Sequence, residues 1–329
     1  MPFTLAPYSP GLAPQWDSFV KESRNGTFLF LRGYMDYHAD RFTDCSWVAR
    51  KGEKIVALLP ANITPDGILH SHQGITYGGW ILPKAHINGA DLLEIFAIAC
   101  ERWREMGIHE LDYKPVPSIY TSQPSEEDLY ALYRLGAQIS NVNISEAITL
   151  SDPLPANKLR RRILNAASRI PFVIEETGDE AAFMAIVEGC LSERHHAHPV
   201  HTAAELAILR SRFPANIRLF ILSTPAGAES SDSSDSSDPL VPAAAVCVYD
   251  TGRVAHTQYI ATTPLGRELN LLTPLLHHLI TRVFPDRAYF DFGTSNQSIG
   301  PHLNEGLLRQ KSSFGASAVA YPRYRLPLL

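Results

Sequence analysis

The 329-residue sequence has few cysteines and no long apolar run. Its four cysteines, Cys45, Cys100, Cys190 and Cys247, lie far apart and form no Cys-x-x-Cys pair, which argues against a zinc ribbon and a dense disulfide framework. We therefore expect buried, reduced thiols. No stretch reaches about 18 consecutive apolar residues and the first residues have no basic start, so we expect neither a spanning helix nor a signal peptide. A cytoplasmic location follows as the expectation.

The sequence also lacks a strong excess of either charge. Its formal net charge of −5 at pH 7 gives the whole surface no field that would attract a polyanion such as nucleic acid. A local basic cluster, KLRRR at residues 158–162, begins an expected helix, and a solvated helix face is the favoured interpretation. An apolar content of 45% excludes general disorder, and the length allows two domains.

One low-complexity segment, AGAESSDSSDSSDPL at residues 226–240, separates two apolar runs. Its Ser, Asp and Gly content cannot bury enough surface to order it, so we predict a flexible loop. The flanking runs at residues 216–224 and 241–250 are typical of strands, and the loop is expected to enlarge the turn between two antiparallel strands. We assign it no catalytic role.

The same order of expected elements occurs twice along the chain. In each half, two helical stretches precede two strands, a helix, a short strand, a second helix and a last strand. The strand, strand, helix and short strand are expected at residues 54–63, 68–79, 90–107 and 108–115, and again at 241–250, 253–264, 268–284 and 287–295. We therefore predict two domains, residues 1–152 and 153–329, each a mixed α/β domain with a mostly antiparallel sheet flanked by helices.

This order of elements resembles the GNAT acyltransferase fold, and its doubling resembles the Fem-like branch of that superfamily. The phrase FDFGTSNQSIGPHLNEGLLRQKSSFG at residues 290–315 carries the resemblance, because Fem-like proteins have a similar Phe-Asp-Phe-Gly run, Ser, Lys and aromatic-Gly. The resemblance implies an acyl- or aminoacyltransferase whose donor is acyl-CoA or, alternatively, aminoacyl-tRNA. It also implies an amine acceptor, on a small molecule or a lipid-linked cell-envelope or polysaccharide precursor. We expect no metal and no integral membrane association.

The GNAT fold binds the donor pyrophosphate after its central strand, where backbone N–H groups at a helix start face the phosphates. The corresponding stretch here, residues 263–268, keeps Gly266 but has Thr in place of the usual basic residue and Glu in place of the last small one. We expect Gly266 and Arg267 to contact the donor, with a simple turn glycine as the alternative for Gly266. The degenerate pattern also keeps a second function open, a catalytically inactive tandem GNAT domain that acts as a binding module.

The expected central strand of the second half carries His256, Gln258 and Tyr259. Alternation along this strand places His256 and Gln258 on one face and Tyr259 on the other. A histidine suits the deprotonation of an acceptor amine, although a half-buried structural histidine is the commoner case. The short strand that follows brings Asp291 to the same edge, with a carboxylate that caps its own turn as the alternative. We predict His256, Gln258 and Asp291 as the catalytic residues.

Polar residues elsewhere are predicted to contact the substrate. The segment ERHHAHPVHTAAE, residues 193–205, has four histidines, and three interpretations are open: a loop beside the acceptor cleft, a structural segment or a metal site. Thr202 and Glu205 indicate a capping box that begins a helix there. Arg32, Asp36 and His38 lie near one another on an expected helix, with surface pairing as the alternative. The predicted substrate contacts are Arg32, Asp36, His38, His72, Tyr77 and Lys114 in the first half, and His198, His201, Ser295 and Lys311 in the second.

Overall fold

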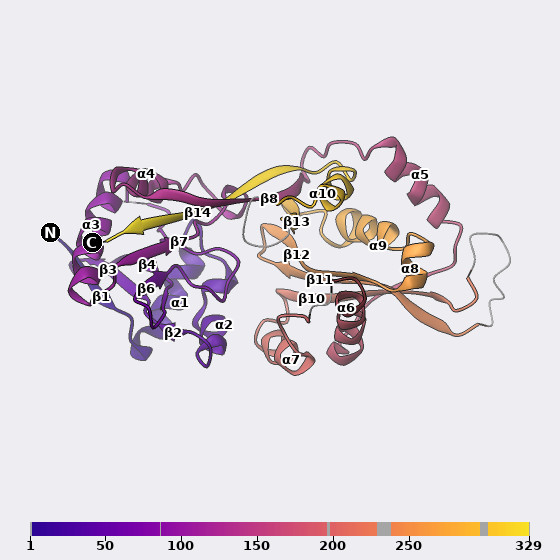
Figure 1. Ribbon diagram of the computed structural model, residues 1–329, viewed down its shortest axis with the longest axis horizontal. Helices are drawn as coiled ribbons and strands as arrows, with labels where there is room; N and C mark the ends of the chain where they lie inside the picture. Colours follow the sequence, from indigo (N-terminus) through magenta and orange to yellow (C-terminus); the bar gives the residue numbers. More distant parts are fainter. Residues whose placement is uncertain (1, 86, 196–197, 229–237, 297–301, 329) are drawn as a thin grey trace. The chain divides into compact units, whose positions relative to one another are not determined.

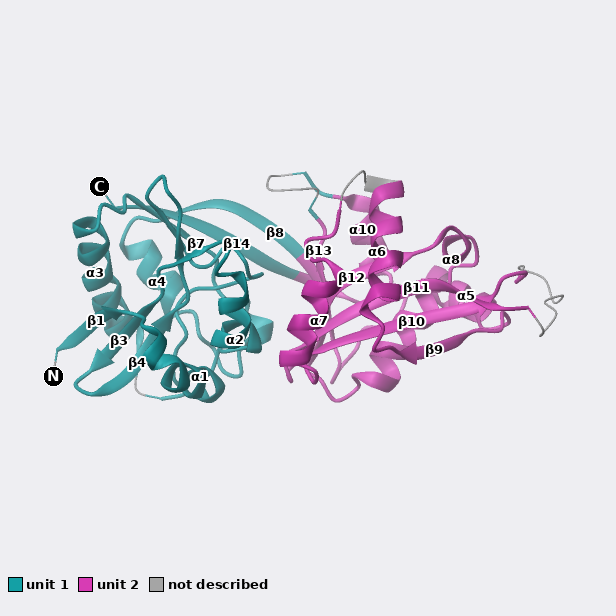
Figure 2. Ribbon diagram, turned by 90° about the horizontal axis from the view of Figure 1, so that it is seen from below, with its two compact units in different colours: residues 1–144, 296–303, 319–329 teal, residues 145–295, 304–318 magenta. Residues whose placement is uncertain are grey.

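The computed structural model describes residues 2–85, 87–195, 198–228, 238–296 and 302–328 (Figure 1). The chain divides into two compact units (Figure 2). Unit 1 comprises residues 1–144, 296–303 and 319–329, and unit 2 comprises residues 145–295 and 304–318. In the described part of the chain, no helix combines the length and the apolar composition needed to cross a membrane.

The last strand of each half of the sequence belongs in part to the unit that the other half builds. Strand β8 (Gln138–Thr149) enters unit 2 at residue 145 and pairs antiparallel with β13 (Tyr289–Thr294). Strand β14 (Ser317–Pro327) enters unit 1 at residue 319 and pairs antiparallel with β7 (Glu110–Tyr113). A single cut at residue 152 therefore does not separate the compact units. As a boundary between independently folding domains, residue 152 stays a prediction.

Unit 1 contains two sheets. The three-stranded antiparallel sheet has the order β1-β3-β4, from β1 (Phe3–Pro7), β3 (Trp47–Lys51) and β4 (Lys54–Leu59). The second sheet has the order β2-β5-β6-β7-β14-β8 and includes β2 (Thr43–Asp44), β5 (Asn62–Ile63) and β6 (Ile68–His70). The helical elements are η1 (Pro10–Leu12), α1 (Ala13–Glu22), η2 (Phe28–Phe30), α2 (Arg32–Met35), η3 (Asp36–His38), α3 (Gly89–Glu105), η4 (Ser118–Tyr120) and α4 (Glu127–Arg134).

Helix α3 shows how the sequence builds the core of unit 1. The Asn88 side chain accepts the N–H group of Asp91, and the Asp91 side chain accepts the N–H group of Asn88, a capping box that starts the helix. Apolar residues three and four positions apart then form one buried face. This face packs into a core with the fully buried rings of Trp80 and Tyr113, which fixes the helix on the strands that carry the polar residues described below.

Unit 2 is built on one sheet with helices on both faces. The sheet has the order β8-β13-β12-β11-β10-β9, with β9 (Val173–Glu176), β10 (Ile217–Pro225), β11 (Leu240–Asp250) and β12 (Val254–Thr262). In Figure 1, α9 and α10 lie over one face and α6 and α7 over the other. The helical elements are α5 (Lys158–Ala167), α6 (Glu180–His195), α7 (Ala203–Arg212), α8 (Pro264–Glu268), α9 (Leu272–His278), η5 (Leu279–Val283) and α10 (Glu305–Ser312).

Both units are mixed α/β, and their sheets are mostly antiparallel with parallel pairs β6–β7 and β12–β13. Strands β10 and β11 pair antiparallel, as expected for the runs on either side of the Ser/Asp segment. The flexibility predicted for that segment concerns residues 229–237, which lie outside the described residues.

Three local predictions are wrong. The helix expected at residues 268–284 is split into α8, α9 and η5, because Asn270 has a φ of 56° and Pro274 is tolerated only in a first helical turn, where an N–H group would have no partner. The strand expected at residues 68–79 ends at His70, since His72 has a φ of 67° and leaves the extended conformation. A bulge at Gln258 interrupts β12, so alternation does not assign the faces of this strand.

Candidate active site

Strands β12 and β13 separate directly after His256 and Asp291. They pair in parallel over Val254–His256 and Tyr289–Asp291. Beyond these residues the two described strands are no longer paired with each other, although β12 continues to Thr262. At the last paired position, His256 Nδ1 lies 2.9 Å from Asp291 Oδ2. Two strands that part in this way leave an opening in the sheet, and the His256–Asp291 pair stands at its edge.

Asp291 holds the His256 ring in one orientation. Its carboxylate is fully buried and also accepts hydrogen bonds from the N–H group of Gly293, at 3.0 Å, and from the Ser145 hydroxyl. Because a carboxylate accepts, Nδ1 of a neutral His256 carries the proton and Nε2 carries the lone pair. The His256 side chain is 11% exposed, and its Nε2 has no hydrogen-bond partner among the described residues. The pair can therefore accept a proton at Nε2.

A pocket of about 470 Å³ lies beside the two strands beyond their last paired position, and neither His256 nor Asp291 lines it. Ile260 and Thr262 of β12 and Phe292 of β13 line it, together with residues of α5, α6, α8, α9 and α10. Among the described residues that line it are three cationic side chains and no carboxylate; the cations are Arg160, Arg267 and Lys311. A lining of this charge suits an anionic ligand.

Lys311 joins this pocket to the end of β13. Its ammonium donates hydrogen bonds to the carbonyl groups of Gly293, at 2.7 Å, and Thr294, at 2.8 Å. Burial lowers the pKa of Lys311 to about 8, although the charge of Asp291 opposes this effect. Asp291 and Ser295 are fully buried and do not line the pocket themselves. The Ser295 hydroxyl has no hydrogen-bond partner among the described residues.

The turn at Gly266 lies in the same pocket, and two of its backbone N–H groups have acceptors within the protein. The Thr263 hydroxyl accepts the N–H group of Gly266, at 3.2 Å, the Thr263 carbonyl accepts that of Arg267, at 3.0 Å, and Pro264 has none. A Cβ atom on Gly266 would stand 1.8 Å from the Ala243 carbonyl oxygen. The glycine is therefore required by packing on β11, and the N–H groups of Gly266 and Arg267 already have acceptors within the protein.

Arg267 is also engaged within the protein. One terminal nitrogen donates to the Thr262 carbonyl at 2.9 Å, and the other forms an ion pair with Glu193 at 2.8 Å. Contact of Gly266 and Arg267 with a donor stays a prediction. Gln258, at the bulge of β12, is partly exposed, and its catalytic role is likewise a prediction.

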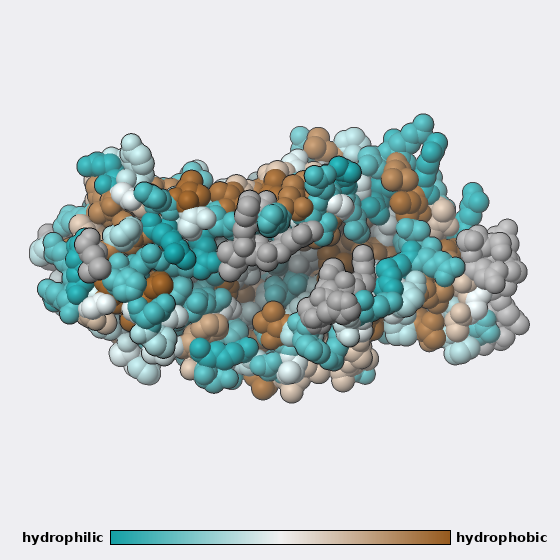
Figure 3. Space-filling view, in the orientation of Figure 1, coloured by the Kyte–Doolittle hydropathy of each residue, from teal (hydrophilic) through white to brown (hydrophobic). Residues whose placement is uncertain are grey.

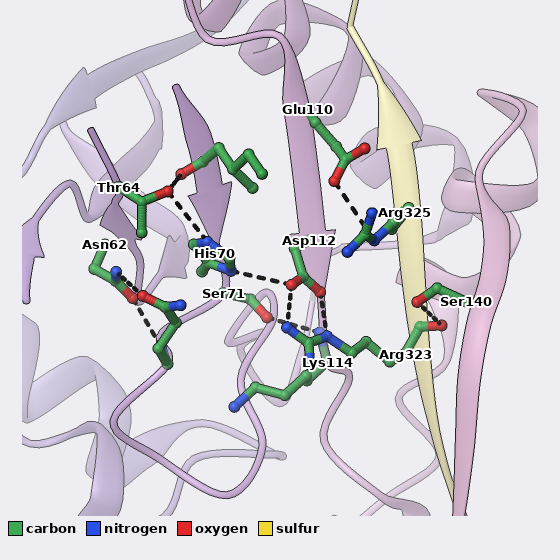
Figure 4. Close-up of polar contacts among 12 residues, drawn as sticks. Asn62, Thr64, His70, Ser71, Glu110, Asp112, Lys114, Ser140, Arg323 and Arg325 are labelled. Atoms are coloured by element: carbon green, nitrogen blue, oxygen red, sulfur yellow. Dashed lines mark hydrogen bonds and ion pairs between the residues drawn. The ribbon is translucent and has the colours of Figure 1, made fainter. Parts of the chain in front are cut away.

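Unit 1 contains a second copy of the His–Asp pair (Figure 4). His70 of β6 and Asp112 of β7 occupy the last paired position of a parallel pair, and His70 Nδ1 lies 3.0 Å from Asp112 Oδ2. His72 was the histidine predicted to function in this part of the sequence, and His70 was not predicted. The signal was present in the strands themselves, because ILH at residues 68–70 and VAH at residues 254–256 each place the histidine third.

The copy in unit 1 is locked by further partners. Arg323 of β14 holds Asp112 with two hydrogen bonds, one of them 2.5 Å from Nε to Oδ1, and the Thr64 hydroxyl lies 3.4 Å from His70 Nε2 (Figure 4). Burial alone would raise the pKa of Asp112, but the hydrogen bonds from His70 and Arg323 and the charge of Arg323 outweigh it and lower the pKa. Ser145 stands in unit 2 where Arg323 stands in unit 1, two positions from the partner of the aspartate along the neighbouring strand.

The opening between the parallel strands is closed in unit 1. The segment after β6 bonds back to β7: the N–H group of Ser71 donates to the Asp112 carbonyl at 2.9 Å, and that of Gly78 donates to the Lys114 carbonyl at 2.7 Å. The Lys114 ammonium donates to the Ile75 carbonyl at 2.6 Å, and burial lowers its pKa to about 8. Tyr77 belongs to the core, packed on the Tyr120 ring at 4.4 Å.

A separate pocket of about 450 Å³ in unit 1 brings together three predicted substrate contacts. Arg32 is buried, stacks on the Tyr8 ring at 3.9 Å and forms ion pairs with Asp36 and Asp44. His72 also lines this pocket, and burial, reinforced by nearby cations, lowers its pKa to about 3. His38 is buried among aromatic rings and is not among the lining residues.

The histidine-rich segment belongs to unit 2, and the structure describes the side chains of His198 and His201. His201 is buried, and its Nδ1 lies 2.7 Å from the hydroxyl of Tyr259, whose pKa burial raises to about 12. The His198 side chain is 82% exposed and lies 3.5 Å from Glu188. The capping box of Thr202 and Glu205 is confirmed. In the part of the chain that the structure describes, no three His, Cys, Asp or Glu side chains gather as metal ligands; His196 lies outside that part.

No protein-family model matches the chain, and no curated protein shows significant sequence similarity to it. Solved structures nevertheless share its fold. FemX matches with a TM-score of 0.71 over 98% of this chain and 97% of that chain, at 10% identity. L-PGS from Bacillus licheniformis matches with a TM-score of 0.56 over 97% and 92%, at 11% identity. A tandem GNAT protein from the clavulanic acid biosynthesis pathway matches with a TM-score of 0.54 over 99% of both chains, at 14% identity. The expected fold class is confirmed.

Proposed function

We propose that this chain, which has the tandem GNAT fold shared with FemX, is an N-acyltransferase whose transfer site lies in unit 2. The observation that carries the proposal is the His256–Asp291 pair at the last position before β12 and β13 separate. His256 Nε2 has no hydrogen-bond partner among the described residues. In the copy in unit 1, the Thr64 hydroxyl lies near His70 Nε2 and Arg323 donates to Asp112. This difference supports unit 2 as the place of the proposed chemistry.

The pair suits direct transfer of an acyl group from an ester or thioester to an amine. The amine nitrogen attacks the donor carbonyl carbon, a C–N bond forms, and His256 Nε2 takes the proton that the nitrogen loses. The C–O or C–S bond then breaks, and the imidazolium returns the proton to the leaving alcohol or thiol. Asp291 keeps the ring oriented and stabilises its positive charge. Backbone N–H groups of β12 beyond His256 supply donors for the developing oxyanion.

The donor is proposed to be acyl-CoA or aminoacyl-tRNA, and both carry phosphate groups. In the α8 turn the N–H groups of Gly266 and Arg267 already have acceptors, so we assign the phosphate contacts to the cationic side chains of the pocket. The acceptor is proposed to be an amine on a small or lipid-linked precursor. Contacts of Arg32, Asp36 and His72, which come together in the pocket of unit 1, with a substrate stay a prediction.

The engaged N–H groups of Gly266 and Arg267 also favour a second candidate function. A tandem GNAT domain that has lost its phosphate-binding backbone can act as a binding module without transfer activity. The two functions differ in one measurable respect, because a binding module forms no amide product with any donor.

The test is a transfer assay with acyl-CoA and charged tRNA donors and a panel of amine acceptors. We expect His256→Asn to lower kcat by about 100-fold or more, the usual effect of losing a general base, because the amide can still donate to Asp291 but cannot take the proton. His70→Asn makes the same change at the matched position of unit 1 and should leave kcat unchanged. Equal loss in both variants would contradict the assignment to unit 2, and the absence of product with every donor would favour the binding module.

A further inference from the structure

Arg160 of α5 is a partly buried cation without a carboxylate partner among the described residues. Burial lowers its pKa, and no acidic group opposes this effect. Its Nε donates to the Ser313 hydroxyl at 2.9 Å, Nη1 to the Thr273 hydroxyl at 2.6 Å and Nη2 to the Gln310 carbonyl at 3.5 Å. A guanidinium has five N–H groups, so two remain without an acceptor in the described part of the protein.

Seven other arginines have side chains that are less than a third exposed and a carboxylate within 4.0 Å, as is usual for a charge removed from water. These pairs are Arg24–Glu127, Arg32–Asp36, Arg210–Glu180, Arg218–Glu176, Arg267–Glu193, Arg287–Asp250 and Arg323–Asp112. In contrast, no ion pair joins Arg160 to a carboxylate in the part of the chain that the structure describes.

The protein holds the Arg160 guanidinium in a fixed place. The group stacks on the Phe314 ring, 4.2 Å from its centroid, and its hydrogen bonds to Ser313 and Thr273 fix its plane. Most other side chains of α5 are exposed, and the surface in the region of α5 mixes hydrophilic and hydrophobic residues (Figure 3). A guanidinium oriented in advance loses little side-chain freedom when it binds a ligand.

Arg160 also stands where two pockets meet. It lines the pocket of about 470 Å³ that Lys311 also lines. It also lines a second, largely apolar pocket of about 500 Å³, to which other residues of α5 contribute. Thr273 and Phe314 line both as well. Any ligand that fills the first pocket therefore comes close to Arg160 and Lys311 together.

We infer that Arg160 binds a phosphate group of the acyl donor. The inference rests on the proposed function. It assigns a phosphate contact to a side chain of α5, because the N–H groups of Gly266 and Arg267 in the α8 turn already have acceptors. Two free N–H groups of one guanidinium match two oxygens of one phosphate. This chemistry is shared by the phosphates of coenzyme A and those at the acceptor end of a tRNA.

The test is calorimetric titration of the full chain with coenzyme A, with deacylated tRNA and with pyrophosphate. We expect one of the first two to bind, which identifies the donor, and Arg160→Gln to weaken that binding tenfold or more. Arg162→Gln is the matched control, because Arg162 is exposed on the same helix and lines neither pocket, and it should change the affinity less than twofold. Raising the salt concentration should weaken binding by wild type more than by Arg160→Gln.

A second measurement does not depend on the folding of a variant. Phenylglyoxal modifies accessible arginines of the wild-type chain, and mass spectrometry locates them; bound ligand should protect Arg160 severalfold and leave Arg162 unprotected. Equal affinity of Arg160→Gln and wild type, equal modification of Arg160 with and without ligand, or no binding of any of the three ligands would overturn the inference and leave Arg160 as an anchor of α5. Failure of the transfer mechanism looks different, because His256→Asn would then keep full turnover while Arg160→Gln still lost binding.

Discussion

Replacement of Arg323 by methionine tests the lock on the His70–Asp112 pair. Asp112 is 3% exposed and Arg323 is 24% exposed, so the variant removes a charge from a largely buried ion pair and leaves the carboxylate behind. Removing one partner of such a pair costs about 3–5 kcal/mol of unfolding free energy. We expect a value near the lower end, about 3 kcal/mol, because His70 still donates to the carboxylate.

The effect should depend on pH in a defined direction. The folded-state pKa of Asp112 is depressed, so its contribution to stability is fully present above the unfolded pKa of about 3.9 and is lost as the pH falls through the folded value. In Arg323→Met the burial of Asp112 remains without the guanidinium, and the pKa rises. The loss of stability should therefore be largest at neutral pH and shrink in acid.

Urea unfolding of both proteins between about pH 4 and 8 measures this difference. Arg325→Met is the matched control. Arg325 lies on the same strand, its side chain is 56% exposed, and its ion pair with Glu110 is long, with 3.5 Å between Nε and Oε1. Its effect should stay within about 0.5 kcal/mol. If Arg323→Met changes the unfolding free energy no more than Arg325→Met, the pair in unit 1 is not a structural lock.

Two further predictions concern Gly266 and Asp128. Gly266→Ala should lower the melting temperature sharply, because the added Cβ would stand 1.8 Å from the Ala243 carbonyl oxygen. Gly189→Ala in α6 is the control: its Cβ would have no neighbour within 4 Å, and it should stabilise the chain by up to about 1 kcal/mol. Thermal unfolding compares the two variants, and equal melting temperatures would contradict the packing argument. Burial raises the pKa of Asp128 to about 6, although a hydrogen bond from Tyr113 opposes it. Its contribution is full below the unfolded pKa of about 3.9 and is lost as the pH rises to about 6, so Asp128→Asn should flatten the decline in stability over that range, and an unchanged slope would disprove the assignment.

Much of the fold was predictable because local signals and apolar spacing agreed. Helices α3 and α7 begin at capping boxes that their sequences contain, and the runs around the Ser/Asp segment form antiparallel strands. The errors came where the backbone leaves regular geometry. His72 and Asn270 have positive φ values, and neither residue announces this in a pattern of apolar spacing.

The candidate site was predictable in its members but not in their arrangement. His256, Asp291 and Lys311 were all expected in unit 2, and the structure brings them to the ends of two neighbouring strands. His70 and Arg160 were not expected to matter. The partners that give them meaning, Asp112 and Ser313, lie 42 and 153 residues away, beyond the reach of any local pattern.

The sequence by itself determined the elements, because helix caps, apolar periodicity and turn residues act over a few positions. The repeated order of these elements also determined that two similar units would form. Only the tertiary structure decided which His–Asp pair stays open. Both pairs have the same strand positions, but in unit 1 Arg323 from β14 neutralises Asp112 and the segment after β6 bonds back to β7, whereas in unit 2 Ser145 from β8 donates a hydrogen bond to Asp291. Long-range pairing sets these neighbours: at matched positions of the adjoining strand, unit 1 has the guanidinium of Arg323 and unit 2 has the hydroxyl of Ser145.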